Sequence, residues 1–278
     1  MRQNLANLDH DIGQMIGRPL QEAMAHGIMN DMIYGGLELG QTTLQGMYAE
    51  SVIKNCMFGT RRVTWDGRVY VYGRALEALL SCFGAMNSSV CPSHYGAAIS
   101  GCAVGGTTIT VTIAGRSAND LVGGQIVMHP ADWGNTMHRR IIGNTATVGG
   151  VSTISFDGGL SHAMIKTSDE VTVYENPYRV LSQINDPYTS IVGVPNRSTQ
   201  ALYYMWNQTW GPCFITWSDA ATIATGQRRS VVWGGDGSLN YADEAENAYM
   251  QHAGFLLNKA KVADKAFEGP EIFLQISP

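Results

Sequence analysis

The pattern of hydrophobic and polar positions changes near residue 59. From there on the chain contains short runs in which apolar and polar residues alternate. Gly, Asn and Asp separate one run from the next. A rhythm of short strands at regular intervals is typical of a β-sandwich or β-barrel. The runs are TTITVTIA, GGQIVMH, RRIIGN, VSTISF, EVTVYEN, TGQRRSVVW, HAGFLLNKA and EIFLQISP. The pattern therefore predicts a mostly β chain made of sandwich-like or barrel-like sections.

The clearest local signal is a hairpin in GTRRVTWDGRVYVYGRA. Val63 and Trp65 alternate with other residues before an Asp-Gly pair, and Val69 and Val71 alternate with tyrosines after it. Asp-Gly between two β-rich runs is the strongest short-range hairpin signal, because both positions of a tight hairpin turn favour such residues. We expect a hairpin that turns at Asp66-Gly67.

Two stretches predict short helices instead. MIGRPLQEAMAHGIMNDMIYGG and ALEALLSCFGAM carry apolar residues near helical spacing. The first lies in an N-terminal segment, residues 1–58, that is rich in Met and lacks strand alternation. Because methionine side chains adapt to irregular apolar contacts, this segment is either a helix on the protein's own core or an arm that docks on a neighbouring molecule.

These patterns divide the chain into three sections. We expect an N-terminal arm at 1–58, a β-rich domain with a helical insert at 59–190, and a C-terminal β domain at 191–278. Asn-Asp-Pro at 185–187 and Val-Pro-Asn at 194–196 interrupt regular structure and place the last boundary.

Composition narrows the class of function. The chain has 278 residues, of which 45% are hydrophobic, 15% are charged and 32 are glycine. Low charge with abundant glycine favours a β-rich protein or a subunit of a larger assembly. The net charge of −5 disfavours a general nucleic-acid binder. The sequence predicts no signal peptide and no membrane helix, and five irregularly spaced cysteines favour reduced thiols.

Three groups of residues have the chemistry of metal ligands. Each lacks the spacing that its metal usually requires, so a structural interpretation is preferred and no cofactor is predicted. The candidates are Cys82, Cys91, His94 and Cys102 for zinc; His129, Asp132 and His138 for iron; and Asp236, Asp243, Glu244 and Glu246 for calcium.

The sequence contains no motif that predicts an enzyme. We find no Gly-x-Ser-x-Gly, no His-Glu-x-x-His and no phosphate-binding loop. Cys213 lies between Pro212 and Phe214 in an apolar run, whereas a reactive thiolate needs a positive and partly exposed environment. We therefore predict no catalytic residues.

The densest aromatic stretch is YYMWNQTWGPCFI, residues 203–215. Strand alternation would place Tyr204, Trp206 and Trp210 on one face, with a corner at Gly211-Pro212 before a second strand. These three aromatic residues are candidates for a core or a subunit interface, because Trp and Tyr anchor protein interfaces. The alternative is a platform that stacks on a carbohydrate.

The chain resembles structural proteins of tailed-bacteriophage particles, in particular capsid decoration (cement) proteins. The resemblance covers residues 35–278 and is modest in specificity; WNQTWGP is its most distinctive part. The chain departs from the pattern of these proteins in two places, the longer and more acidic loop 234–250 and segment 76–105. The resemblance is carried by GTRRVTWDGRVYVY, ENPY, GVP, YYMWNQTWGPC and the run from TIATGQRRSVVW through HAGFLLNKA to EIFLQI.

The resemblance implies a non-enzymatic, often trimeric protein on the outer surface of the capsid. Its expected partners are the major capsid protein and copies of itself, and its expected location is the virion after synthesis in the host cytoplasm. No functional residue is carried over. The alternatives are a head-fibre base, a tail or receptor-binding component, and a carbohydrate-binding module that uses the aromatic strand 203–210.

Overall fold

The computed structural model describes residues 32–34, 45–88, 94–97, 100–166, 168–183, 189–217, 229–242, 250–257 and 271–277. Within these ranges the chain forms two curled antiparallel sheets, each close to a half-barrel, which confirms the mostly β, barrel-like prediction. Helix is nearly absent there: only Trp133–Asn135 (η1) is helical, as one 3-10 turn. No helix in the described ranges has the length and apolar character needed to cross a membrane.

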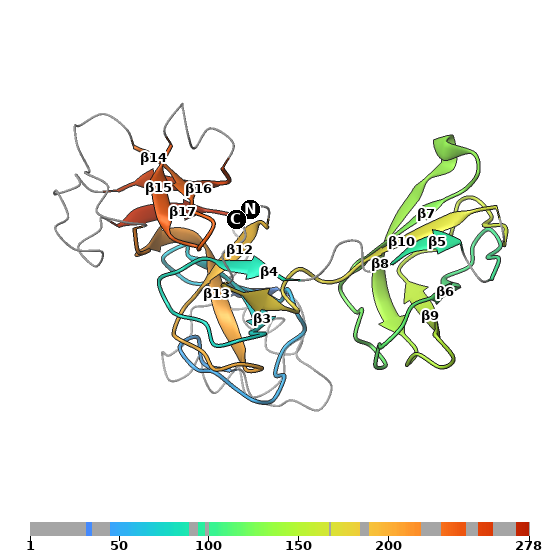
Figure 1. The fold of residues 1–278 in the computed structure, drawn as a ribbon, viewed down its shortest axis with the longest axis horizontal. Helices are drawn as coiled ribbons and strands as arrows, with labels where there is room; N and C mark the ends of the chain where they lie inside the picture. The colour runs from blue at the N-terminus through green and yellow to red at the C-terminus, as the bar shows by residue number, and fades with distance from the viewer. Residues whose placement is uncertain are drawn as a thin grey trace, which may run out of the picture.

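The two sheets form two lobes joined by a narrow neck (Figure 1). The main lobe contains the first and last strands of the chain, and the insert lobe contains the strands between them. The main-lobe strands are β1 (Met32–Tyr34), β2 (Arg61–Val63), β3 (Val69–Arg74), β4 (Ala85–Asn87), β11 (Leu181–Ser182), β12 (Ile191–Pro195), β13 (Tyr204–Cys213), β14 (Ser230–Trp233), β15 (Leu239–Tyr241), β16 (His252–Leu256) and β17 (Ile272–Gln275).

The insert lobe is a curled six-stranded sheet in the order β5-β10-β7-β8-β9-β6. Its strands are β5 (His94–Ala97), β6 (Thr108–Thr112), β7 (Gln125–His129), β8 (Met137–Asn144), β9 (Val151–Phe156) and β10 (Glu170–Tyr174). The two edge strands, β5 and β6, contact each other, so the sheet curls almost to closure.

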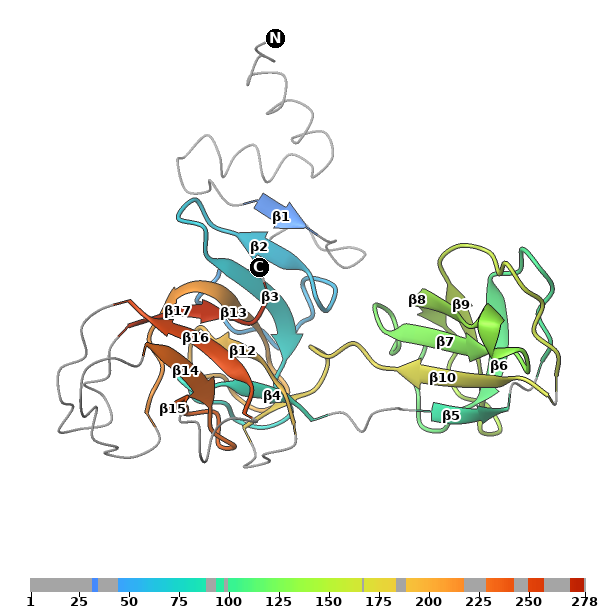
Figure 2. The same cartoon turned by 90° about the horizontal axis from the view of Figure 1, so that it is seen from above.

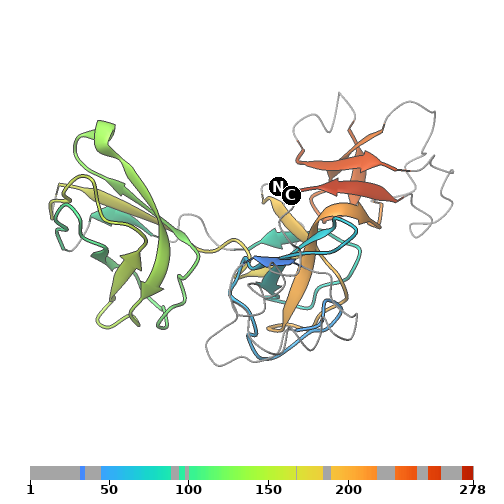
Figure 3. The same ribbon diagram turned by 180° about the vertical axis from the view of Figure 1, so that it is seen from behind.

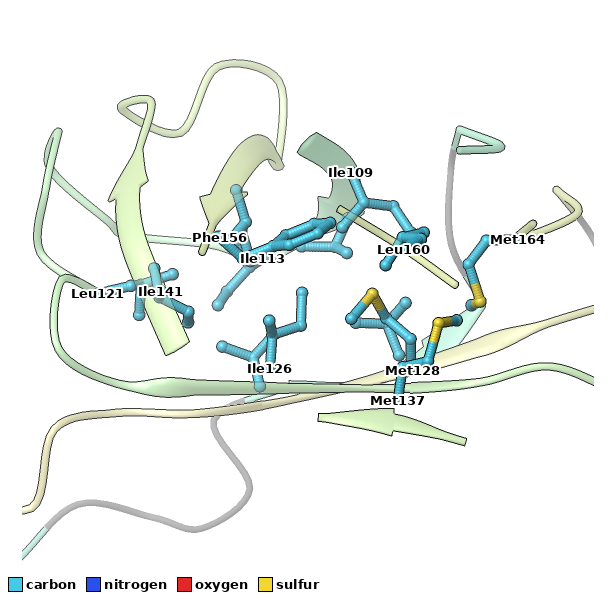
Figure 4. Packing of buried hydrophobic residues seen from close by; sticks show 14 residues of the cluster. Ile109, Ile113, Leu121, Ile126, Met128, Met137, Ile141, Phe156, Leu160 and Met164 are labelled. Atoms are coloured by element: carbon cyan, nitrogen blue, oxygen red, sulfur yellow. The ribbon is translucent and has the colours of Figure 1, made fainter. Parts of the chain in front are cut away.

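Side chains at alternate positions of the insert-lobe strands fill the interior of this lobe. β7 and β9 bury every second residue, as a strand with one solvent face must. The inward side chains form one core, in which Phe156 and Ile126 are fully buried and methionines close one end (Figure 4). All fourteen buried residues of this core come from positions 109–173, so the insert lobe carries its own hydrophobic core.

The main lobe is organised around β13, its longest strand. β13 pairs with β3 on one side and with β12 and β17 on the other, and β16, β14 and β15 continue the sheet beyond β17 (Figure 2). At the opposite end, β3 is followed by β2 and β1. Strands from both ends of the sequence thus build one sheet.

The hairpin predicted at Asp66-Gly67 is present. β2 and β3 pair from Val63 opposite Val69, and Gly67 has a φ of +83°, which favours glycine. The Asp66 carboxylate accepts hydrogen bonds from the Thr64 hydroxyl and the Arg68 side chain. A second Asp-Gly turn, at 236–237, joins β14 to β15 in the same manner.

Other sequence predictions need correction. The expected helix ALEALLSCFGAM does not form: Ala75 and Leu79 make bridges to Leu181 and Thr199, and the stretch ends in β4. Backbone pairing with distant segments replaces the local helical bonds. The expected helices of the N-terminal arm lie largely outside the described residues. The part of that stretch that is described, Met32–Tyr34, is a strand.

The expected section boundaries do not coincide with the sheets. β2, β3 and β4, which were assigned to section 59–190, share a sheet with the strands of 191–278. The second sheet comprises only 94–174, so this segment is inserted into the main lobe. Pairing between β3 and β13 spans more than a hundred residues and leaves no local mark in the sequence.

Asp169 ties two loops of the insert lobe together. Its carboxylate accepts hydrogen bonds from the backbone amides of Ile165 (2.6 Å) and Ala131 (3.0 Å). Burial alone would raise the pKa of this carboxyl, but the hydrogen bonds outweigh it and hold the pKa below its ordinary value.

Stability of the insert lobe should therefore depend on Asp169 and on pH. We expect Asp169→Asn to cost about 1–3 kcal/mol near neutral pH. A carboxyl with a depressed folded pKa stabilises the fold above its unfolded pKa, and this stabilisation is lost as pH falls through the folded value. Denaturant titrations should thus show a gap between wild type and variant that shrinks below about pH 4. A gap of constant size down to pH 3 would contradict this role.

Candidate assembly surface

β13 continues through the Gly211-Pro212 pair as one strand, whereas a corner between two strands was expected. Glycine is needed there because its φ is +94° and a Cβ would lie 2.9 Å from Arg68 Cγ. Pro212 has no backbone N–H and therefore cannot donate a hydrogen bond to a neighbouring strand. Its carbonyl accepts a hydrogen bond from the Gln208 side-chain amide at 2.7 Å. The stretch is therefore a strand with an internal irregularity.

That irregularity separates the aromatic residues that alternation placed on one face. Gln208 lies opposite Tyr70 of β3, but Trp210 lies opposite the next residue, Val69, so Thr209 is an extra residue in β13. An extra residue shifts the phase of the side chains that follow it. Trp206 and Trp210 consequently belong to two different aromatic groups.

The first group is part of the core. Trp206 is fully buried, and its ring contacts Tyr72 edge-on at a centroid distance of 5.1 Å. Tyr204, which is partly buried, stacks on Tyr72 at 6.1 Å and on Phe58 at 6.0 Å. These rings stabilise the main lobe and leave Trp206 inaccessible to any ligand.

Gln45 provides the polar partners of this core. Its carbonyl accepts the Trp206 indole N–H at 3.1 Å, and its side-chain oxygen accepts the Tyr72 hydroxyl at 2.8 Å. Its side-chain nitrogen donates to the carbonyls of Ala49 and Tyr204. A buried polar group stabilises a core when its hydrogen bonds are satisfied, so Gln45 holds the N-terminal segment against β13.

The second group forms a row on the outer face of the main sheet. The aromatic row consists of Trp210 of β13, Phe273 of β17 and Phe255 of β16, three side chains on neighbouring strands. Trp210 meets Phe273 edge-on at 5.4 Å, and Phe273 stacks on Phe255 at 5.3 Å. Phe255 is 39% exposed and the other two are partly buried.

The surroundings of the row are apolar on one side and polar on the other. Leu257, immediately after β16, is exposed like Phe255. His252, at the other end of the strand, is also exposed and its Nε2 is 2.9 Å from the Ser230 hydroxyl. An accessible apolar centre beside polar groups is the composition of a protein interface.

Ring geometry distinguishes between a protein contact and a carbohydrate platform. A sugar stacks on an aromatic face that is open to solvent. In the row, Phe255 and Phe273 stack on each other at an interplanar angle of 7°, so each ring covers a face of the other. Stacking therefore leaves each of these two rings only one face for a sugar, which favours packing against apolar side chains.

Sequence reasoning missed Phe255 and Phe273. Each lies in a strand far from β13 in the chain, and only pairing between the strands assembles the row. A signal was present, however: in β17, Ile272 and Leu274 point inward, which places Phe273 at a position usually taken by a polar residue. An aromatic residue at a solvent-phase position is a reasonable marker of an interface.

The zinc candidates are not brought together among the described residues. Cys82 lies in the main lobe, where its carbonyl accepts the Thr216 amide, whereas His94 and Cys102 lie in the insert lobe. Cys102 forms a backbone bridge to Met164. Cys91 lies outside the described residues. In the described part of the chain, no group of three or more potential ligands surrounds a common point.

The iron candidates occupy different roles in the insert lobe. His129 Nε2 is 3.0 Å from the Thr172 hydroxyl on the neighbouring strand. Asp132 accepts hydrogen bonds from the Gly134 amide and the Asn135 side chain in a turn. His138 is exposed on β8, beside a shallow depression that Arg140 and Asp157 also line. Turn formation and strand pairing account for these positions.

Asp236 is the only calcium candidate within the described residues. Its carboxylate accepts the backbone amide and the hydroxyl of Ser238, which closes the β14–β15 turn. Asp243, Glu244 and Glu246 lie outside the described residues.

Cys213 is the last residue of β13 and is buried in the main-lobe core. Burial raises the pKa of its thiol to about 12. At neutral pH the group is therefore a neutral thiol that packs as a small apolar side chain.

Comparison of the chain with models of protein families, with curated proteins and with solved structures found no match. The geometry described above, together with the sequence resemblance, is therefore the basis for a functional assignment.

Proposed function

We propose that this chain is a non-enzymatic structural protein of a tailed-bacteriophage particle, which binds the outer capsid surface and stabilises the head. The single observation that supports this most is the aromatic row of Trp210, Phe273 and Phe255 on the outer face of the main sheet. Its partners in this proposal are the major capsid protein and further copies of the chain, in a homotrimer.

The row has the character of an interface anchor. Aromatic side chains carry much of the energy of protein interfaces, because each buries a large apolar area with few rotamers to immobilise. β17 is anchored in the core beneath the row: the side chains of Ile272 and Leu274, on either side of Phe273, are fully buried. A rigid aromatic surface binds with a small loss of conformational entropy.

A trimer would multiply this contact. Three copies present three rows to a repetitive capsid lattice, and the second and third contacts form at high effective concentration once the first is made. Modest single contacts can in this way hold a protein on a capsid without covalent bonds.

The test is binding of the purified chain to capsids that lack it. We expect the double substitution Phe255→Ser/Phe273→Ser to weaken capsid binding by at least about tenfold, because truncation of an anchoring aromatic residue costs on the order of 2 kcal/mol. Co-sedimentation with capsids measures the affinity, and circular dichroism verifies that the variant is folded.

Ile142→Ser is the matched control. Ile142 is an exposed aliphatic residue on β8 of the insert lobe and lies outside the row, so its loss should leave binding unchanged. Wild-type affinity in a folded double variant would exclude the row as the contact. Failure of the wild-type chain to bind any capsid preparation would overturn the decoration function itself.

A further inference from the structure

We propose that residues 175–179 form a clasp that locks the insert lobe in one orientation to the main lobe, so that the two lobes move as one rigid body. The inference rests on the contacts of the neck alone and does not depend on the proposed function. Figure 3 shows the neck from behind, between the two lobes.

The covalent connections by themselves would leave the insert lobe free to swing. The chain leaves the main lobe after β4 and returns at β11, and these two strands pair, with Asn87 opposite Leu181. It enters the insert lobe at β5 and leaves it from β10, which also pair, with His94 opposite Val173. The two connections therefore begin at paired strands and end at paired strands, and such a double link acts as a hinge unless other contacts restrain it.

Apolar packing does not supply the restraint within the described residues. The insert-lobe core draws only on positions 109–173, and the three main-lobe clusters draw only on residues outside that range. Orientation of the lobes must therefore depend on polar contacts at the neck.

The first polar contact is a chain of ion pairs. Glu175, whose side chain is 6% exposed, pairs with Arg116 of the insert lobe and with Arg179, the latter at 2.6 Å. Arg179 also reaches Asp120 of the insert lobe at 3.2 Å. Ion pairs of low exposure are screened less by salt than surface pairs, so this chain holds the return segment against the 116–120 loop.

The second contact joins both lobes through one side chain. The Asn176 side-chain nitrogen donates to the Phe58 carbonyl of the main lobe at 3.0 Å and to the Gly123 carbonyl of the insert lobe at 3.3 Å. Its side-chain oxygen accepts the Tyr178 amide at 3.0 Å, which fixes the orientation of the group. Asn176 is 4% exposed, so water competes little for these bonds.

Two glycines allow the lobes to approach Asn176. Gly59 of the main lobe and Gly123 of the insert lobe both have positive φ, +79° and +82°, and both lie beside the Asn176 side chain. A Cβ on Gly123 would lie 2.6 Å from the Asn176 side-chain nitrogen, closer than real contacts allow. Loops from both lobes are thus shaped around this one amide. The return segment is then anchored to the main lobe by the Arg74 amide, which donates to the Tyr178 carbonyl at 3.0 Å.

The experiment measures whether the lobes tumble as one body. Residual dipolar couplings of the full chain give an alignment tensor for each lobe. We expect a single shared tensor in the wild type and two different tensors in Glu175→Gln/Asn176→Ala, with chemical shifts of both cores unchanged. Asn196→Ala is the matched control, since its amide donates to the Met47 carbonyl within the main lobe only, and it should keep one tensor.

Two results would overturn the clasp: different tensors for the two lobes of the wild type, or a single tensor in the folded double variant. If the double variant does not fold, Asn176→Ala/Arg179→Gln removes the bridge to Phe58 and Gly123 together with the link to Asp120, keeps Glu175 as the partner of Arg116, and decides the question by the same criterion.

Discussion

Trp206→Ala is expected to destabilise the main lobe by about 3–5 kcal/mol, the usual cost of deleting a large buried aromatic side chain. Trp206 is fully buried beside Tyr72, and its removal also leaves the Gln45 carbonyl without the indole N–H that it accepts. The cavity and the lost hydrogen bond act in the same direction. Denaturant titration followed by NMR signals of each lobe would measure the loss.

Trp65→Ala is the control for that prediction. Trp65 is the same residue type in the same lobe but is 80% exposed, so its truncation should change stability by less than about 0.5 kcal/mol. Signals of the insert lobe should respond to neither substitution, because its core contains no main-lobe residue. Equal stability of the two Trp variants would contradict the placement of Trp206 in the core.

The insert lobe is expected to fold when residues 94–175 are expressed alone. Its core is complete, and its two ends leave neighbouring strands, so excision cuts the chain where β5 and β10 are paired. A domain of this size is only marginally stable, and the excised lobe also loses the contacts of Asn176 and Arg179. Cooperative unfolding and dispersed amide signals would confirm an independent unit.

Phe156→Ala tests whether the excised lobe depends on its own hydrophobic core for stability. Phe156 is fully buried, and its truncation should cost about 3–5 kcal/mol, enough to unfold most of the fragment. Ile142→Ala, at an exposed position on β8, should leave it folded. A wild-type fragment with random-coil spectra would show that the lobe requires the rest of the chain.

Features that depend on residues close together in the sequence could be predicted, and features that depend on residues far apart in the sequence could not. The Asp66-Gly67 hairpin was predicted correctly because turn geometry depends on two adjacent residues. The ALEALLSCFGAM helix was wrong because Ala75 and Leu79 pair with residues over a hundred positions away. Local propensity is weak beside such tertiary pairing.

The candidate site shows the same division on a smaller scale. The aromatic density of 203–215 drew attention to β13, but its residues have two separate roles. Because Thr209 is an extra residue in the strand, Trp206 lies in the core whereas Trp210 lies on the outer face. Phe255 and Phe273 join Trp210 only through the pairing of β16, β17 and β13.

The sequence by itself determined that this protein is mostly β and where most of its strands lie, because strand alternation and Gly or Asp turns are local properties of the chain. Tertiary structure alone decided that 94–174 is inserted into a lobe made by both ends of the chain, and that an aromatic row and the Asn176 contacts exist. Such features arise from pairing between distant strands. An alternating sequence is compatible with many pairing registers, and only the simultaneous packing of all strands selects one register.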